Sequence, residues 1–287
     1  MYEVEHVLAS QAELGEGPVW HPGEQVLYFL DITQGRLHRF NPLDGQHEIT
    51  ELGVVVGSMG VRETGGWVMA TGKGFMLRER NGQMTLIGDP DADENESVRF
   101  NDGKTDPTGR FWAGKMSNTP TNSLYRLDTD LSIHRMESGI GVSNGLGWSP
   151  DLKTFYYTDS PAKIIYAYDY DVNSGLISNR RNFAVVPEDG GSPDGLAVDS
   201  EGCIWSARWG GWKIVRYAPD GQVLAEIPMP VELPTSCAFG GPNLDELYIT
   251  SAYVAVPVER RAEQPLAGDV FRVRAGVRGL PEPYFKG

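Results

Sequence analysis

The stretch SNGLGWSPDLK at residues 143–153 is echoed by SPDGLAVDSEG at residues 192–202. In both stretches a polar residue precedes a glycine, a short apolar run and a polar turn. Asn144 holds the polar position in the first copy, and Asp194 holds it in the second. A pattern that returns at such an interval is typical of a fold built from equivalent structural units.

Four further stretches carry the same pattern, namely ELGEGPVWHPGEQ, VGSMGVRETGG, RFNDGKTDPTGR and PTSCAFGGPNLD. One equivalent residue can be taken from each of the six copies. These six positions are Glu16, Ser58, Asn101, Asn144, Asp194 and Ser236. They follow one another at steps of 42, 43, 43, 50 and 42 residues, and the long step contains additional residues around NRRNFAVVPEDGGS. A period of about 45 residues is typical of propeller blades, so six copies predict six blades.

Short runs rich in Val, Ile, Tyr, Trp and Phe, such as VLYFLDI, FYYTDS and LYITSA, recur between Gly-rich turns. No segment has a sustained helical period of apolar residues. These features predict an all-β fold, a six-bladed β-propeller with four-stranded antiparallel blades that occupies residues 1–287 as a single domain. We expect the run EVEHVLA at residues 3–9 to close the ring, as the outer strand of the last blade against residues 268–276.

The six equivalent positions predict a ring of polar side chains around one mouth of the propeller channel, because the inner strand of every blade lines that channel. Two carboxylates that point into one space repel each other unless a cation or a proton lies between them. Oxygen ligands suit hard divalent ions, and none of the five histidines lies in the ring, which disfavours a histidine-based zinc site. A solvated channel mouth without a ligand is the alternative.

Composition limits the partners. The formal net charge of −14 disfavours nucleic acid and anionic membranes and makes a cation the better candidate partner. The simpler explanation for most of the charge is that it keeps the surface soluble. The N-terminus does not resemble a signal peptide, and no apolar run approaches the ~20 residues of a membrane helix. Cys203 and Cys237 lie in apolar surroundings and are expected to be buried thiols, which favours a reducing, cytoplasmic location.

Five separated segments, in order along the chain, resemble the signature segments of the senescence-marker-protein/gluconolactonase family, which includes regucalcin. They are LGEGPVW, RFNDGKTDPTGRFWAGKM, SNGLGWSPD, SPDGLAVD and CAFGG. The resemblance extends from Glu13 to about Gly268. It implies a six-bladed propeller that hydrolyses sugar lactones with the help of one divalent metal ion.

The resemblance also implies roles for individual residues. Glu16, Asn144 and Asp194 correspond to the metal ligands, Arg99 and Asn101 to the residues that contact substrate, and Asp194 in addition to the acid/base. Three of these positions and Asn101 are also members of the ring defined by the repeat.

The chain departs from the animal members of the family at one place. Where those proteins have an acidic residue that touches substrate, this chain has AGKMSNTPTN, with Lys115, Asn118 and Thr119 and no acid. Arg208, beyond an inner strand, is a candidate contact for an anionic substituent, although pairing with surface acids is the simpler expectation. Three tryptophans are candidates to shape the pocket: Trp20, Trp148 and Trp209.

The small-molecule partner that we expect is a sugar lactone, and the expected reaction is the opening of an aldonolactone to the aldonic acid. The metal would polarise the lactone carbonyl, and Asp194 would take a proton from water and return one to the ring oxygen. A hydroxide activated by the metal is the competing explanation. Ca, Zn, Mn, Mg and Fe(II) all remain candidate metals, and we expect a monomer or a weak homo-oligomer. The alternatives are a metal-dependent esterase or phosphotriesterase, and a regulatory propeller without catalysis.

Overall fold

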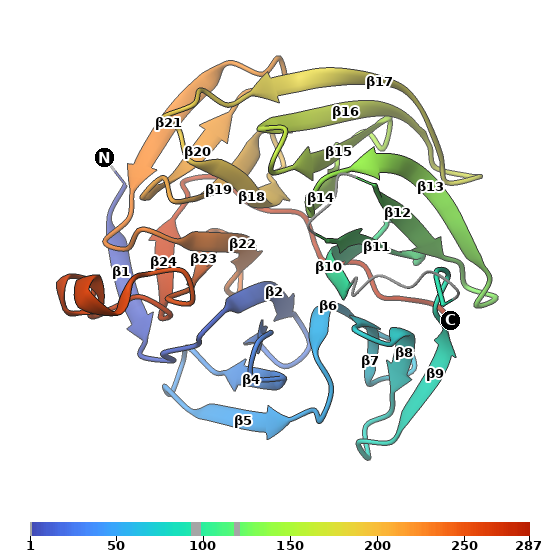
Figure 1. The fold of residues 1–287 in the computed structure, drawn as a ribbon, viewed down its shortest axis with the longest axis horizontal. Coiled ribbons are helices and arrows are strands. Elements are labelled where there is room, and N and C mark those ends of the chain that lie inside the picture. Colours follow the sequence, from blue (N-terminus) through green and yellow to red (C-terminus); the bar gives the residue numbers. More distant parts are fainter. Residues whose placement is uncertain (1, 93–98, 118–120) are drawn as a thin grey trace.

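The computed structural model describes residues 2–92, 99–117 and 121–287. Within them, 24 strands form six four-stranded antiparallel sheets that stand around a central channel like blades (Figure 1). In each blade the strand nearest the channel comes before the others in the repeat, and the sheet then runs outward. The prediction of a six-bladed propeller is confirmed.

The first three blades follow the chain directly, each in the order inner strand to outer strand. Blade 1 consists of β2 (Gly15–His21), β3 (Val26–Asp31), β4 (Arg36–Phe40) and β5 (His47–Glu51). Blade 2 consists of β6 (Val56–Val61), β7 (Trp67–Thr71), β8 (Gly74–Arg78) and β9 (Met84–Gly88). Blade 3 consists of β10 (Arg99–Thr105), β11 (Phe111–Met116), β12 (Asn122–Leu127) and β13 (Ile133–Ile140).

The last three blades repeat this order, except that the final blade borrows its outer strand from the N-terminus. Blade 4 consists of β14 (Ser143–Trp148), β15 (Thr154–Asp159), β16 (Ile164–Asp171) and β17 (Leu176–Val185). Blade 5 consists of β18 (Ser192–Val198), β19 (Ile204–Trp209), β20 (Lys213–Tyr217) and β21 (Val223–Pro228). Blade 6 consists of β22 (Pro234–Gly240), β23 (Glu246–Ser251), β24 (Val270–Arg274) and β1 (Val4–Leu8).

The ring closes through β1, as expected. Val4 pairs with Val273 in the antiparallel ladder between β1 and β24. Beside it, Arg272 Nη2 lies 2.5 Å from Glu5 Oε2 and ties the first strand to the last by charge as well. The closing strand thereby covers an edge of β24 that would otherwise expose unpaired backbone groups.

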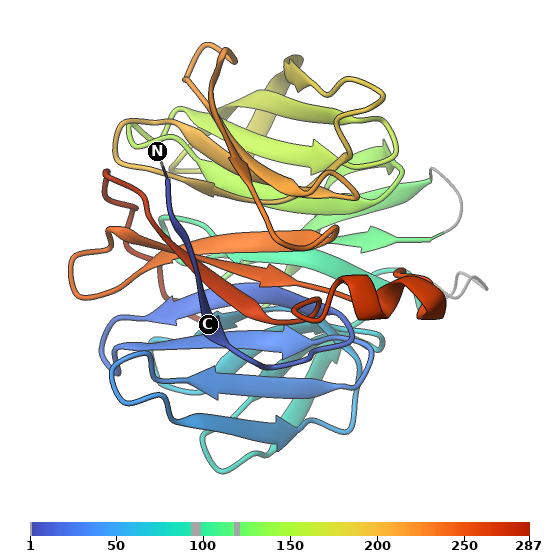
Figure 2. The same cartoon turned by 90° about the vertical axis from the view of Figure 1, so that its left-hand side faces the viewer.

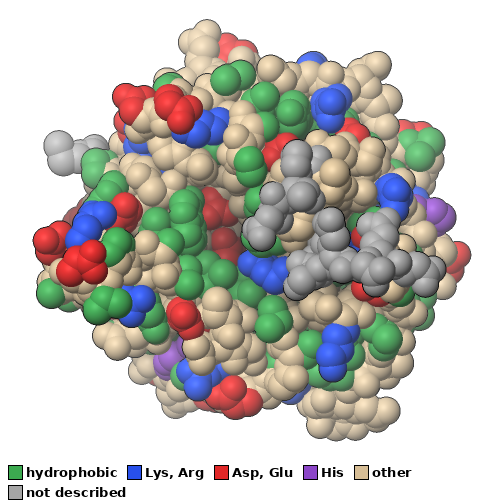
Figure 3. All heavy atoms as spheres, in the orientation of Figure 1, with side chains coloured by type: hydrophobic (Ala, Val, Ile, Leu, Met, Phe, Trp, Pro, Cys, Tyr) green, Lys and Arg blue, Asp and Glu red, His purple; other side chains and the backbone are tan. Residues whose placement is uncertain are grey.

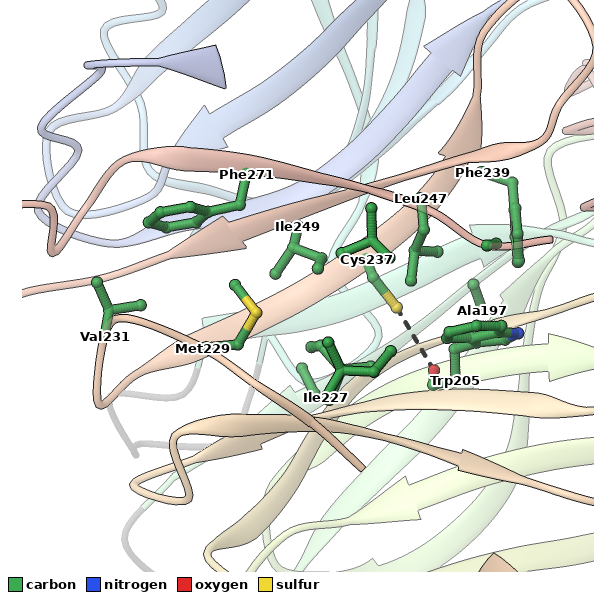
Figure 4. Close-up of a cluster of buried hydrophobic side chains, with 14 of the residues drawn as sticks. Ala197, Trp205, Ile227, Met229, Val231, Cys237, Phe239, Leu247, Ile249 and Phe271 are labelled. Carbon is green, nitrogen blue, oxygen red and sulfur yellow. Dashed lines mark hydrogen bonds between the residues drawn. The ribbon is translucent and has the colours of Figure 1, made fainter. Parts of the chain in front are cut away.

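The hydrophobic core lies in the seams between neighbouring blades, because the middle strands of each sheet are buried on both faces. Figure 4 shows the seam between blades 5 and 6, where Trp205 and Phe271 belong to one cluster of buried side chains. The thiol of Cys237 donates to the carbonyl oxygen of Trp205 at 3.4 Å within this cluster. Cys237 and Cys203 are both free and buried, as predicted.

A buried aspartate after the inner strand explains the second half of the repeated sequence. In blade 3, Asp106 Oδ1 accepts the backbone amide of Arg110 at 3.1 Å, and its Oδ2 accepts the indole N–H of Trp112 at 3.1 Å. In blade 5, Asp199 accepts the amide of Cys203 and the indole N–H of Trp205, both at 2.9 Å. The carboxylate thus fixes the turn and anchors the next strand in both blades.

The C-terminal segment crosses the channel mouth that lies opposite the ring (Figure 1). Gly279 forms a bridge with Asp199 of blade 5, and Phe285 forms one with Arg62 beside blade 2. A 3₁₀ helix, η1 (Val258–Glu263), projects from the loop between β23 and β24 (Figure 2). No helix within the described residues has the length and apolar character required to cross a membrane.

Candidate active site

The six ring positions each lie at an irregularity of an inner strand. The register shifts between Glu16 and Val19 in β2 and between Asn144 and Leu146 in β14, and the other four inner strands shift at the equivalent place. An extra residue in one strand of a pair bends that strand and changes the direction of its side chains. Six equivalent bulges therefore form a collar of redirected side chains around one mouth of the channel.

Glycines beside the ring allow the inner strands to approach one another closely. A Cβ atom on Gly145 would lie 2.7 Å from the carbonyl oxygen of Asp194, and one on Gly195 would lie 2.0 Å from Ser236 Oγ. Real Cβ atoms do not come so close to their neighbours, so both positions require glycine. This explains why each copy of the opening sequence places a glycine directly after the polar ring residue.

A cavity of about 330 Å³ opens at this mouth, where Figure 3 shows a hollow with acidic side chains at its base. The twelve residues that line it are Leu14, Glu16, Arg99, Asn101, Met116, Val142, Asn144, Ser160, Pro161, Ser192, Asp194 and Trp209. All five residues that the sequence analysis selected are among them. Ser58 and Ser236, the remaining ring members, instead border a smaller space of about 30 Å³ in the channel.

A chain of hydrogen bonds crosses the cavity from blade 3 to blade 5. Arg99 Nη1 donates to Asn101 Oδ1 at 2.8 Å, and Asn101 Nδ2 donates to Asn144 Oδ1 at 2.6 Å. Asn144 Nδ2 then donates to Ser160 Oγ at 2.7 Å, and Ser160 Oγ donates to the carbonyl oxygen of Pro193 at 2.5 Å. Each donor fixes the orientation of the next acceptor, so the two amide side chains are held with defined directions.

The two ring carboxylates are buried, with Glu16 4% and Asp194 5% exposed. Burial raises the pKa of both well above the usual range, and the nearby Asp102 carboxylate raises it further in each case. Glu16 Oε2 accepts the backbone amide of Gly17 at 2.8 Å, which opposes this shift in part. Among the described residues, neither carboxylate forms an ion pair with Lys, Arg or His.

The donor set fits a divalent cation. Burial of two carboxylates that form no ion pair is unfavourable even with the attraction of Arg99 nearby, and a cation between them would reduce that cost. The set contains only oxygen donors, which Ca²⁺, Mg²⁺ and Mn²⁺ prefer. Asn144 Oδ1 accepts one hydrogen bond and, as an sp² oxygen, keeps a second lone pair. A bound ion would thus explain why two carboxylates, Glu16 and Asp194, are buried without an ion pair.

Several other side chains lie elsewhere than the sequence led us to expect. Arg208 is 1% exposed, does not line the cavity and donates to Ser206 Oγ at 2.8 Å and to the hydroxyl of Tyr217. It therefore pairs neither with surface acids nor with a ligand in the cavity. Trp209 lines the cavity, whereas Trp20 and Trp148 belong to buried clusters between blades.

Lys115, in the segment that departs from the animal proteins, does not line the cavity. Its Nζ lies 2.6 Å from Asp89 Oδ1 and 2.8 Å from Asp91 Oδ2. The positions of Asn118 and Thr119 lie outside the described residues.

Sequence reasoning missed two site features, Ser160 and the buried Asp102. Ser160 follows β15 and so lies outside the aligned stretches. Asp102 directly follows the ring residue Asn101, and the direction of its side chain depends on the bulge in β10, which the sequence does not reveal.

A second cluster of possible ligand atoms is a structural feature of blade 5. One ligand atom each of Asp199, Glu201 and Cys203 lie within 4.8 Å of one another. Arg216 Nη2, however, lies 2.7 Å from an oxygen of each carboxylate. Because the guanidinium already neutralises them, this cluster has no need of a metal ion.

Comparison with known proteins agrees with the geometry. Residues 14–253 match the model of a family described as the SMP-30/gluconolactonase/LRE-like region. The chain belongs to this family. The resemblance that the five separated segments indicated is thereby confirmed, and the match includes the whole set of cavity residues.

Three members of the SMP-30/gluconolactonase family illustrate the similarity. The chain is 43% identical to a 6-deoxy-6-sulfogluconolactonase of Pseudomonas putida, over 98% of each chain. It is 40% identical to a pentonolactonase of Haloferax volcanii, over 97% of each. The crystal structure of regucalcin from Agrobacterium tumefaciens, described as a calcium-binding protein, superposes with a TM-score of 0.94 at 27% identity, over 99% of this chain and 97% of that one.

Proposed function

We propose that this protein hydrolyses a sugar lactone, an aldonolactone, to the open-chain aldonic acid. The observation that carries the proposal is the convergence of Glu16, Arg99, Asn101, Asn144 and Asp194, from four different blades, on one cavity. The lactonase names of two relatives that are 43% and 40% identical over nearly the whole chain support the same activity.

Glu16, Asn144 and Asp194 would hold one divalent cation in this proposal. When bound, such an ion polarises the lactone carbonyl and stabilises negative charge on its oxygen. The calcium-binding description of the regucalcin structure supports a divalent ion, and Ca²⁺, Zn²⁺, Mn²⁺, Mg²⁺ and Fe²⁺ are the candidates to compare.

Arg99 and Asn101 would bind the hydroxyl groups of the sugar. Arg99 offers several N–H donors in a fixed fork, and Asn101 offers both a donor and an acceptor. Their own hydrogen bond of 2.8 Å holds the two groups in one orientation before substrate arrives. A substrate that meets prearranged donors loses less free energy to side-chain ordering on binding.

Asp194 would exchange the protons of the reaction. Its carboxylate takes a proton from the water whose oxygen attacks the carbonyl carbon. It then returns a proton to the ring oxygen as the C–O bond to that oxygen breaks, which yields the carboxylic acid and the free hydroxyl. The acid group then loses its proton to solvent at neutral pH. In the chain without a bound ion, burial raises the pKa of Asp194, and a bound cation would oppose that shift.

The remaining parts of the proposal concern location and assembly. We infer a cytoplasmic enzyme that acts as a monomer or a weak homo-oligomer on a small molecule. The two free, buried cysteines support a reducing compartment. Cell fractionation and light scattering of the purified protein test these two points.

The experiment that tests the activity is a hydrolysis assay with a panel of five- and six-membered aldonolactones. The protein is first freed of metal with a chelator and then reconstituted with each candidate ion, and the acid released is followed above spontaneous ring opening. We expect activity that requires a divalent ion and favours lactones over simple esters. Hydrolysis of aryl esters or phosphotriesters without any lactone activity would overturn the proposal.

A further inference from the structure

The positions that follow the ring residues form a second layer of the channel wall. These positions are Gly17, Met59, Asp102, Gly145, Gly195 and Cys237. Three of them are glycines and two are uncharged, so only blade 3 places an ionisable carboxylate there. The glycines leave room in the channel. Among these six positions Asp102 alone borders this room with a charge, while Lys104 and Glu282 border it from other positions.

Asp102 borders the space of about 30 Å³ below the ring, together with Ser58 and Lys104. A cavity needs about 10–15 Å³ for one water molecule, so this space can hold water. Asp102 is 7% exposed and Ser58 is 1% exposed, yet Asp102 Oδ1 and Ser58 Oγ both lack a hydrogen-bond partner. Two buried polar atoms without partners around one small space call for a polar occupant.

Asp102 also lies close to the two proposed carboxylate ligands. The small space that it borders is lined as well by Gly17, which directly follows Glu16, and by Leu196, two residues after Asp194. The positive charges of Arg99 and Lys104 partly offset the negative charge of Asp102. Lys104, however, is already paired, because its Nζ lies 3.3 Å from Glu282 Oε1. Three carboxylates therefore face one region with incomplete compensation.

We propose that Asp102 is a positioning residue for the divalent cation. From the channel side, through water held in the space below the ring, its carboxylate strengthens the binding of the cation by Glu16, Asn144 and Asp194. This inference rests on the proposed function, because it assumes the cation at that site. It goes beyond that function because Asp102 is neither one of the three ligands nor a substrate contact.

The test is the substitution Asp102→Asn, which keeps the shape of the side chain and removes its charge. Affinity for Ca²⁺ and Mn²⁺ is measured by titration calorimetry on the metal-free protein, and melting temperature is measured with and without metal. We expect affinity to fall about 10- to 100-fold, the usual effect of losing a supporting group around a metal site. We also expect the metal-free variant to melt at a higher temperature than the wild type, because one repulsive buried charge is gone.

Weaker metal binding together with a higher melting temperature of the metal-free variant distinguishes the proposed role from a structural one. Loss of a structural contact would lower the melting temperature of the metal-free protein, and that result would overturn the inference. Ser58→Ala removes the other unpartnered group of the same space without a change in charge, and its metal affinity should match the wild type. Equal affinity of Asp102→Asn and wild type would also overturn the inference and leave the proposed metal site intact. If the wild type itself binds no divalent cation, the metal site and the inference both fail.

Discussion

Asn101 Nδ2 donates a hydrogen bond of 2.6 Å to Asn144 Oδ1, although the two residues are 43 positions apart and belong to adjacent blades. The same Asn101 nitrogen also donates to the carbonyl oxygen of Ser143 at 2.8 Å. A proposed substrate contact thus orients a proposed metal ligand, which couples the two parts of the site.

Asn101→Ala should impair both functions at once. The variant loses a partner for the sugar and leaves Asn144 oriented only by its bond to Ser160. We therefore expect kcat/KM to fall about 10- to 100-fold and the metal concentration for half-maximal activity to rise. Steady-state assays across a metal titration measure both quantities. Asn173→Ala, in an exposed turn of blade 4, is the control and should change neither. A change in KM alone at unaltered metal dependence would show that the coupling is absent.

Asp194→Asn tests the role of Asp194 as acid/base. The substitution retains one ligating oxygen and removes the proton acceptor, so turnover should stay about 10²- to 10⁴-fold low even at saturating metal. Asn144→Ala removes a neutral ligand and no proton acceptor, so excess metal should restore it more fully. The measurement is turnover of an aldonolactone against metal concentration for both variants. Near wild-type turnover of Asp194→Asn at high metal would exclude its role in proton transfer.

A divalent cation should stabilise the folded chain, because it removes the repulsion between Glu16 and Asp194 and binds the folded state preferentially. At a free concentration of 100 times Kd the gain is about 2.7 kcal/mol. For a chain of 287 residues, whose entropy of unfolding is about 0.6 kcal/mol/K, that corresponds to a rise in Tm of about 4–5 °C. Differential scanning calorimetry of the chelated protein with added CaCl₂ or MnCl₂ measures the shift. Glu16→Gln should reduce it, and an unchanged Tm at saturating metal would contradict a site of this kind.

A pair of histidines in blade 1 should make the fold sensitive to acid. His38 Nδ1 lies 2.9 Å from His47 Nε2, and burial lowers the pKa of His38 to about 4 from 6.5. Above pH 6.5 His38 is neutral in both folded and unfolded chains, so it contributes no pH dependence. Between pH 6.5 and 4 the unfolded chain takes up a proton that the folded chain does not, so stability falls as the pH falls.

The histidine effect can be isolated by urea unfolding at pH 7 and pH 5. For the wild type the contribution of His38 to the loss between these values is on the order of 1–2 kcal/mol. His38→Phe should lose less stability over the same range, since Phe fits against Phe29, whose ring lies 4.5 Å from that of His38. The exposed His134→Gln should behave as the wild type. Identical pH dependence in wild type and His38→Phe would contradict the prediction.

The repeat made most of the fold predictable. A period of about 45 residues with a polar residue before a glycine determined the number of blades and placed Glu16, Asn144 and Asp194 in equivalent positions. The pairing of β1 with β24 followed from the need to cover a strand edge. The family resemblance is confirmed by the match over residues 14–253. The assignment of all 287 residues to one domain stays a prediction.

The rest depended on contacts that a periodic pattern does not encode. Arg208 was a candidate ligand contact, but the hydroxyl of Tyr217, on the next strand, holds its guanidinium inside blade 5. Ser160 became visible only because the turn after β15 folds back on Asn144. The path of the C-terminal segment across the far mouth also has no counterpart in the repeat, since the residues after Gly276 contain no copy of it.

The place of β1 beside β24 has a consequence for synthesis on the ribosome. The first strand to emerge cannot pair until β24, whose Val273 is the partner of Val4, has also emerged. Throughout translation of the blades between them, the nascent chain is an open arc with one unpaired strand at its leading end. Contacts of such large sequence separation slow folding, so completion of the ring is a late step of folding. The complete propeller that holds Glu16 and Asp194 around one cavity is therefore reached only at the end of that process.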